Sequence, residues 1–140
     1  TVANITVRSS SLKGTTVGGD IIPRLIDELP IIAVAAVFAD GQTVIKDAQE
    51  LKVKETNRIR AVVDEFNKCG IDITETDDGM IINGGKSIHG ADFKTYGDHR
   101  MAMSLTVLAQ LADSESTLDD SDCACVSYPT FFDDFYKLKK

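Results

Sequence analysis

The sequence repeats itself at an interval of 73 residues, and this repeat constrains the fold more than any other feature. Residues 38–47 align with residues 111–120, with Ala39 and Ala112 as one matching pair. Upstream, residues 12–14 align with residues 88–90 after a shift of three residues. The repeat is longer than the roughly 20–50 residues of a solenoid unit, so two copies predict a pseudo-symmetric α/β domain. The first copy begins in mid-pattern at Asn4, and we expect at least one more copy before Thr1.

Hydrophobic periodicity predicts the elements of the first copy. Two strands are expected, joined by a serine turn, then a helix, a strand and a second helix. Apolar residues surround the first helix on nearly every side, which predicts a helix buried between other elements. The second helix is amphipathic, starts near Glu55 and stops at Gly70, a residue typical of helix ends. The expected ranges are 4–8 and 12–17 for the strands, 27–39 for the first helix and 41–47 for the third strand.

The second copy predicts the same order of elements, and the second strand of a hairpin is its first strand. The turn residues 77–79 separate two short apolar runs, which is typical of a β-hairpin. The remaining expected elements are a strand over 92–96, a helix over 98–112, a strand over 116–119 and a helix over 130–138. We therefore expect one domain over residues 1–140, made of about two repeat units with a boundary near 70–76.

Composition excludes several classes of protein. The net charge is -7, which argues against nucleic-acid binding through a basic surface. No apolar run reaches the roughly 18 residues of a membrane span, so we expect no membrane partner. Cys69, Cys123 and Cys125 lack metal-ligand spacing, and we expect reduced thiols in a cytoplasmic protein without a metal. The chain begins with Thr1 and no signal-peptide pattern, so we expect that an upstream part is missing or was cut.

Charged residues gather where two helices are expected to begin. Residues 52–58 place cations around Glu55 on an expected first helical turn, and residues 98–100 (Asp-His-Arg) open the next helix in the same way. A helix start attracts anions through its unpaired N–H groups and its dipole. Two such starts with added cations predict one anion-binding site, in which Glu55 could transfer a proton.

Three motifs together carry a family resemblance that covers almost the whole chain. Leu25–Pro30, Leu51–Ile59 and Tyr96–Met103 resemble the C-terminal half of the bacterial 5-enolpyruvylshikimate-3-phosphate (EPSP) synthases, or 3-phosphoshikimate 1-carboxyvinyltransferases. The resemblance implies an α/β fold, the inside-out α/β barrel domain of the enolpyruvyl transferases. Such a domain consists of repeated βαβαββ-like units with buried helices. It also implies a two-domain enzyme with its active site between the domains, of which this chain holds about two units.

The same resemblance implies the reaction and its residues. The family transfers the enolpyruvyl group of phosphoenolpyruvate to the 5-hydroxyl of shikimate 3-phosphate and releases phosphate, without cofactor or metal. Asp27 matches the carboxylate beside the 5-hydroxyl, and Glu55 matches the acid and base at the methylene carbon. The matching substrate-binding residues are Lys54, Arg58, His99 and Arg100. The other partner is the missing N-terminal half, so we expect the isolated chain to be inactive or very weakly active.

Plainer interpretations stand beside these roles. Asp27 could cap a helix, Asp98 is expected to be an N-cap, and residues 54–58 could form a solvated helix face. Family members often have aspartate in place of Asn57. Some have a phosphoenolpyruvate-binding lysine in place of Val126, which predicts fewer cationic contacts to the phosphate here. Two other functions remain open. One is enolpyruvyl transfer to UDP-N-acetylglucosamine, and the other is a non-catalytic anion-binding interaction domain.

Overall fold

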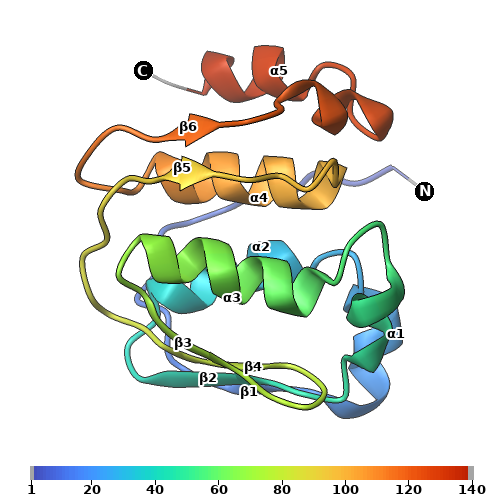
Figure 1. Cartoon of the computed structure of the whole chain (residues 1–140), viewed down its shortest axis with the longest axis vertical. Coiled ribbons are helices and arrows are strands. Elements are labelled where there is room, and N and C mark those ends of the chain that lie inside the picture. The colour runs from blue at the N-terminus through green and yellow to red at the C-terminus, as the bar shows by residue number, and fades with distance from the viewer. Residues whose placement is uncertain (1, 139–140) are drawn as a thin grey trace.

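The computed structural model describes residues 2–138 of the chain, so Thr1, Lys139 and Lys140 of the expected domain lie outside the described residues. Helices and short strands alternate along the chain. In Figure 1, α2 and α3 lie against the larger sheet of β1 to β4, and α4 lies next to the smaller sheet of β5 and β6. The elements are, in order, β1 Thr16–Val17, η1 Gly19–Ile21, α1 Ile22–Leu25, α2 Leu29–Val37, β2 Gln42–Ile45, η2 Gln49–Val53, α3 Arg58–Lys68, β3 Asp72–Glu75, β4 Met80–Asn83, β5 Asp92–Phe93, α4 His99–Ala109, β6 Thr117–Leu118, η3 Asp122–Val126 and α5 Phe131–Lys137.

The larger sheet has four strands in the order β1-β2-β4-β3. β1 and β2 are parallel, whereas β4 is antiparallel to both β2 and β3. The β3–β4 hairpin is the one predicted from the turn at residues 77–79, and Thr76 N–H donates to Gly79 O at 3.0 Å across it. Alternate residues of β4, Met80 and Ile82, are fully buried, so one face of this sheet covers the core.

The smaller sheet reproduces the parallel pair of the larger one and confirms the repeat at the level of residue register. Thr16 pairs with Val44 in the first unit, and Asp92 pairs with Thr117 in the second. Val44 and Thr117 are related by the 73-residue interval of the sequence repeat, and Thr16 and Asp92 by the same interval plus the shift of three residues. The 3-10 helices η2 and η3 also occupy matching positions 73 residues apart. The repeat therefore describes a real structural unit.

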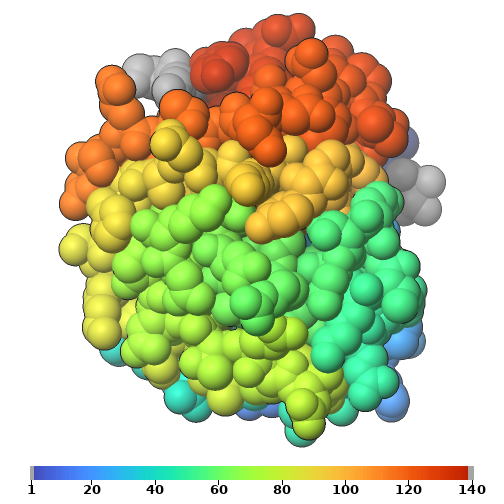
Figure 2. All heavy atoms as spheres, viewed as in Figure 1, coloured from blue at the N-terminus to red at the C-terminus, as the bar shows by residue number. Residues whose placement is uncertain are grey.

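The buried helices form the centre of the molecule. α2 packs against α3, α4 and β4, and α3 packs against β3. Six residues of α2 are buried, as its apolar sequence predicts, although Ile31 is 39% exposed. α3 is amphipathic as expected, and its outer residues form the centre of the face seen in Figure 2. Gly70 ends it with a φ of 76°, which favours glycine.

The expected strand over residues 4–8 is wrong. Residues 2–12 form no strand, and Val2, Ile5 and Val7 are at least 86% exposed. A strand needs a neighbour for its N–H and C=O groups. Within the described residues only the last residue of this segment has a backbone partner, since Leu12 O accepts from Asp40 N–H at 2.9 Å. The expected strand over 12–17 is shortened to Thr16–Val17 and an isolated bridge from Lys13 to Asp40. Over residues 2–138, no helix combines the length and apolar character needed to cross a membrane.

Two glycines at matching repeat positions allow the strands to approach each other closely. A Cβ at Gly14 would lie 2.2 Å from Gln42 O, and a Cβ at Gly90 would lie 2.0 Å from Glu115 O. Because both neighbours are backbone atoms, Gly14→Ala and Gly90→Ala are each expected to lower the free energy of unfolding by about 1–3 kcal/mol. Urea unfolding measures this effect.

The neighbouring exposed side chain of Thr15 supplies the matched control. Thr15→Ala should leave the unfolding midpoint almost unchanged. Equal stability of Gly14→Ala and the unsubstituted chain would contradict the close approach of β1 and β2.

Candidate active site at the first turns of α3 and α4

The side chain of Arg58 is the centre of the candidate site. Arg58 is the first residue of α3, and its side chain is 1% exposed. Asn57 caps this helix, its side chain accepting a hydrogen bond from Arg60 N–H. The guanidinium donates four hydrogen bonds to three carboxylates, namely Asp98 (2.7 and 3.2 Å), Asp27 (2.9 Å) and Glu55 (2.6 Å). Arg58 therefore brings together residues from three separate parts of the chain.

The charge of Arg58 is maintained by these neighbours. Burial by itself lowers the pKa of Arg58, but the hydrogen bonds and negative charges of Asp98, Asp27 and Glu55 together outweigh burial, and the net pKa is raised. The guanidinium is thus cationic at neutral pH, although it has little contact with water.

Asp98 connects the two helix starts predicted from the sequence. It is fully buried and is the N-cap of α4, as expected. Its Oδ1 accepts hydrogen bonds from Arg100 N–H at 2.8 Å and Met101 N–H at 3.3 Å, while both of its oxygens accept from Arg58. The first residues of α3 and α4 therefore lie side by side at one end of the molecule (Figure 1).

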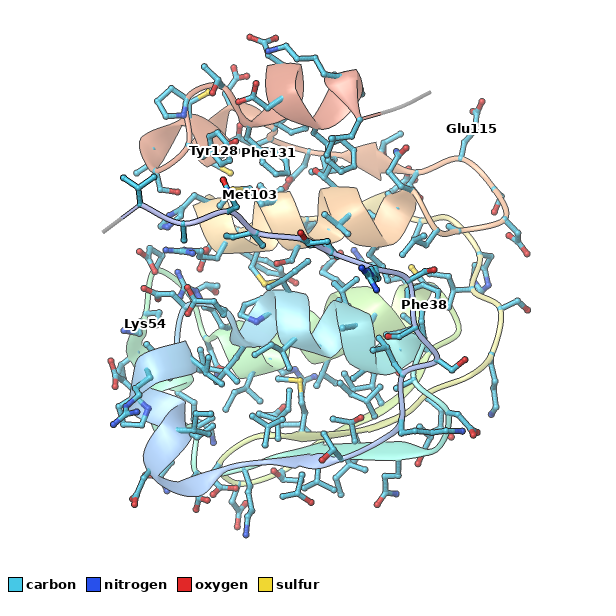
Figure 3. All side chains as sticks on the ribbon, turned by 180° about the vertical axis from the view of Figure 1, so that it is seen from behind. Phe38, Lys54, Met103, Glu115, Tyr128 and Phe131 are labelled. Atoms are coloured by element: carbon cyan, nitrogen blue, oxygen red, sulfur yellow. The ribbon has the colours of Figure 1, made fainter. Side chains whose placement is uncertain are left out.

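The position of Lys54 and Glu55 corrects one expectation. They do not lie on the first turn of α3 but in the segment between η2 and α3, because the helix begins only at Arg58. Lys54 lies at this end of the molecule (Figure 3) and donates to Glu50 at 2.7 Å. From this non-helical segment Glu55 still reaches Arg58, and its carboxylate accepts a hydrogen bond from the guanidinium at 2.6 Å.

Asp27 and Glu55 are held by the same guanidinium and remain accessible, with side chains 42% and 46% exposed. The hydrogen bond from Arg58 is the largest influence on Asp27. With the charge of Arg100, it outweighs burial and lowers the pKa of the Asp27 carboxyl. Asp27 is therefore ionised at neutral pH and can accept a proton. It does not cap α2, which begins at Leu29 without a side-chain cap.

His99 and Arg100 complete the cluster from the first turn of α4. His99 Nδ1 lies 4.0 Å from a carboxylate oxygen of Glu55, and the His99 side chain is 13% exposed. The ion pairs of Arg100 are long, 3.8 Å to Asp27 and 3.9 Å to Glu28. Within residues 2–138 its buried Nε has no hydrogen-bond partner. Arg100 thus has donors to offer a ligand, whereas the donors of Arg58 are largely engaged.

The structure brings all six sequence-predicted site residues together. Ion pairs link Asp27, Glu55, Arg58, His99 and Arg100, and the positive charge of Lys54 contributes to lowering the pKa of Asp27. Sequence reasoning missed two acidic neighbours, Glu28 beside Arg100 and Glu50 beside Lys54. It also missed the contact of Asp98 with Arg58. The four-residue spacing of Glu50 and Lys54 was a readable signal for that pair, but no local spacing links residues 58 and 98.

Carboxylates outnumber cations around Arg58. Asp27, Glu28, Glu50, Glu55 and Asp98 face Lys54, Arg58 and Arg100. This balance differs from the positive anion cradle expected from the sequence. In the described part of the chain, no group of three or more His, Cys, Asp and Glu side chains is arranged to hold a metal ion.

Residues outside the cluster agree with their expected roles. Met101, Leu105 and Leu108 are fully buried core residues of α4, and His89 is exposed. The three cysteines are free thiols. Burial raises the pKa of Cys69 to about 11, so this thiol is protonated and unreactive at neutral pH.

Comparisons with known proteins point to one family. Residues 1–135 match the family model for EPSP synthase (3-phosphoshikimate 1-carboxyvinyltransferase). The chain is 57% identical to the 3-phosphoshikimate 1-carboxyvinyltransferase of Bacillus cereus (strain B4264) over 138 residues, covering 99% of this chain and 32% of the relative. It is also 57% identical to that of Listeria innocua over 137 residues, covering 97% of this chain and 32% of the relative. The chain thus spans about a third of the length of these relatives.

Solved structures give the same family. An EPSP synthase from Acinetobacter baumannii matches with a TM-score of 0.87 and 37% identity, over 91% of this chain and 30% of that one. The enolpyruvyl transferase NikO from Streptomyces tendae matches with a TM-score of 0.64 and 20% identity, over 92% of this chain and 28% of that one. The second likeness concerns the fold alone, and both agree with an α/β enolpyruvyl transferase fold.

Proposed function

The chain belongs to the EPSP synthase family, and from this we propose that a protein carrying it transfers the enolpyruvyl group of phosphoenolpyruvate to shikimate 3-phosphate. The acceptor is the 5-hydroxyl, and phosphate is released. In this proposal the chain supplies one part of the active site, and a preceding N-terminal half supplies the rest. The free cysteines support a reducing, cytoplasmic location.

The observation that carries the proposal is the pair of accessible carboxylates held by one buried guanidinium. The reaction needs one group that takes the proton of the attacking hydroxyl and another that protonates the methylene carbon of phosphoenolpyruvate. Asp27 suits the first task because its carboxylate is 42% exposed and is held in place by the guanidinium of Arg58 at 2.9 Å. We assign Glu55 to the second, since its carboxyl is 46% exposed and the same guanidinium holds it at 2.6 Å.

The cations of the cluster suit the anionic parts of the substrates. We assign Arg100 the first contact with a carboxylate or phosphate, because its side chain is 31% exposed and its Nη atoms make long ion pairs of 3.8 and 3.9 Å. Lys54 precedes Glu55 in the chain, and the side chain of His99 lies near that of Glu55. We assign both residues, together with Arg58, to substrate binding. Since carboxylates outnumber cations here, two anionic substrates need further cations, which we assign to the N-terminal half.

A chimera tests this function in a full-length protein. This chain replaces the matching 138 residues of the Bacillus cereus relative, and phosphate release is measured with both substrates. We expect turnover that requires both phosphoenolpyruvate and shikimate 3-phosphate, and none from the relative lacking the replaced segment. A folded chimera without turnover would overturn the proposal and favour the non-catalytic anion-binding domain. Turnover with UDP-N-acetylglucosamine in place of shikimate 3-phosphate would favour the sister reaction.

A further inference from the structure

The carboxylate of Asp98 makes more contacts than a helix cap requires. Asn57 caps α3 with a single hydrogen bond from Arg60 N–H at 3.1 Å. Asp98 instead accepts two bonds from the backbone of α4 and two from the guanidinium of Arg58. A cap needs one acceptor oxygen and no full charge, so capping alone does not explain a fully buried aspartate.

Burying this carboxylate is costly unless a cation is paired with it. The compensating cation is Arg58, whose Nε donates to Asp98 Oδ2 at 2.7 Å and whose Nη2 donates to Oδ1 at 3.2 Å. This side-on pairing occupies the Nε edge of the guanidinium plane. Nη1 is then directed toward Asp27, and Nη2 donates to Glu55 as well as to Asp98.

The segment before Asp98 is itself firmly anchored. Asp98 N–H donates to Thr95 O at 3.0 Å, and the Thr95 side chain and N–H both donate to Asp119 within 2.9 Å. Tyr96 adopts a positive φ of 58°, and its hydroxyl donates to the buried carboxylate of Glu65 at 2.8 Å. Asp98 is therefore a fixed point against which the long side chain of Arg58 is oriented.

We propose that Asp98 is a positioning residue of the transfer reaction, which acts through Arg58 and sets the start of α4 relative to the start of α3. This inference rests on the proposed function and deepens it. Asp98 itself does not touch the substrates. It fixes the guanidinium that aligns Asp27 and Glu55, and its cap on α4 places His99 and Arg100 opposite them. Alignment within about 1 Å is worth about 100-fold in rate at such sites.

The test uses the chimera described above and the variant Asp98→Asn. Asparagine retains a cap acceptor and the side-chain size, but it removes the charge and turns an amide toward Arg58. We expect kcat/KM for phosphoenolpyruvate to fall about 100-fold, with KM for shikimate 3-phosphate unchanged. A purely structural defect would reduce the amount of active enzyme and so lower kcat without separating the two KM values.

A double-mutant cycle with Arg58→Gln shows whether Asp98 acts through Arg58. If it does, the double variant loses little more activity than Arg58→Gln alone, because the effects of coupled residues are not additive. Additive losses would overturn the proposal, as would full activity of Asp98→Asn. Inactivity of the unsubstituted chimera would instead overturn the proposed function, so the two failures are distinguishable.

Two further variants separate positioning from folding. Asp119→Asn weakens an anchor of the same segment without contacting Arg58, and it should leave the KM for phosphoenolpyruvate unchanged. Asp98→Ser keeps a helix N-cap and replaces Asp98→Asn if the latter does not fold. Failure of both Asp98 variants to fold would overturn the positioning role in favour of a structural one.

Discussion

Glu55→Gln is expected to lower the kcat of the chimera about 10²- to 10⁴-fold, the range typical of a lost general acid or base. Glutamine keeps the size of the side chain and a hydrogen bond to Arg58, but it carries no proton for the methylene carbon of phosphoenolpyruvate. Binding of the substrates should persist, since Arg58 and Arg100 are unchanged. Phosphate release under saturating concentrations of both substrates measures the effect.

Glu115→Gln is the matched control for this experiment. Glu115 is an exposed carboxylate in the turn before β6, far from Lys54 in Figure 3, and its substitution should leave kcat unchanged. If Glu55→Gln kept the activity of the unsubstituted chimera, Glu55 would not be the proton donor. His99, the neighbouring titratable side chain at 4.0 Å, would then be tested next.

Arg58→Leu is expected to have the largest effect on stability. The substitution leaves Asp98 as a fully buried carboxylate without its cation, and breaking such a pair costs about 3–5 kcal/mol. The variant also removes the hydrogen bond that lowers the pKa of Asp27. Denaturant unfolding of the chain measures the loss, as the midpoint multiplied by the slope.

The pH dependence of this variant follows from the sign of the shift at Asp27. A carboxyl whose folded pKa is lowered contributes stability above its unfolded pKa of about 4, and this contribution is lost as the pH falls through the lowered folded pKa. Arg58→Leu should therefore remove a part of the acid-dependent stability that the unsubstituted chain has at pH 7.

Arg60→Leu supplies the control on the same helix. Arg60 has a side chain that is 62% exposed, and it pairs with Asp64 and Glu75 in solvent. Exposed pairs contribute little to stability, so this variant should unfold almost as the unsubstituted chain does. Equal losses for the two arginines would show that burial of the Arg58–Asp98 pair is not the source of its stability.

The sequence determined the repeat, and the repeat determined much of the fold. The two parallel strand pairs have the same register, because matching residues of the two units form the same backbone hydrogen bonds. Lys46 N–H donates to Val17 O at 3.0 Å in one unit, and Asp119 N–H donates to Phe93 O at 3.0 Å in the other. A hydrophobic pattern alone did not decide the strand over 4–8, because a strand also depends on a neighbour that sequence periodicity does not reveal.

The sequence also determined which charged residues form the candidate site, because the three motifs single them out. Only the tertiary structure decided how these charges are arranged. Arg58 and Asp98 are 40 residues apart and meet because two helix starts pack together. There the buried cation is compensated by the three carboxylates that it contacts, so Arg58 organises these acids while Arg100 keeps an unpaired Nε within the described residues. Burial and pairing depend on distances across the fold, and no local spacing in the chain records them.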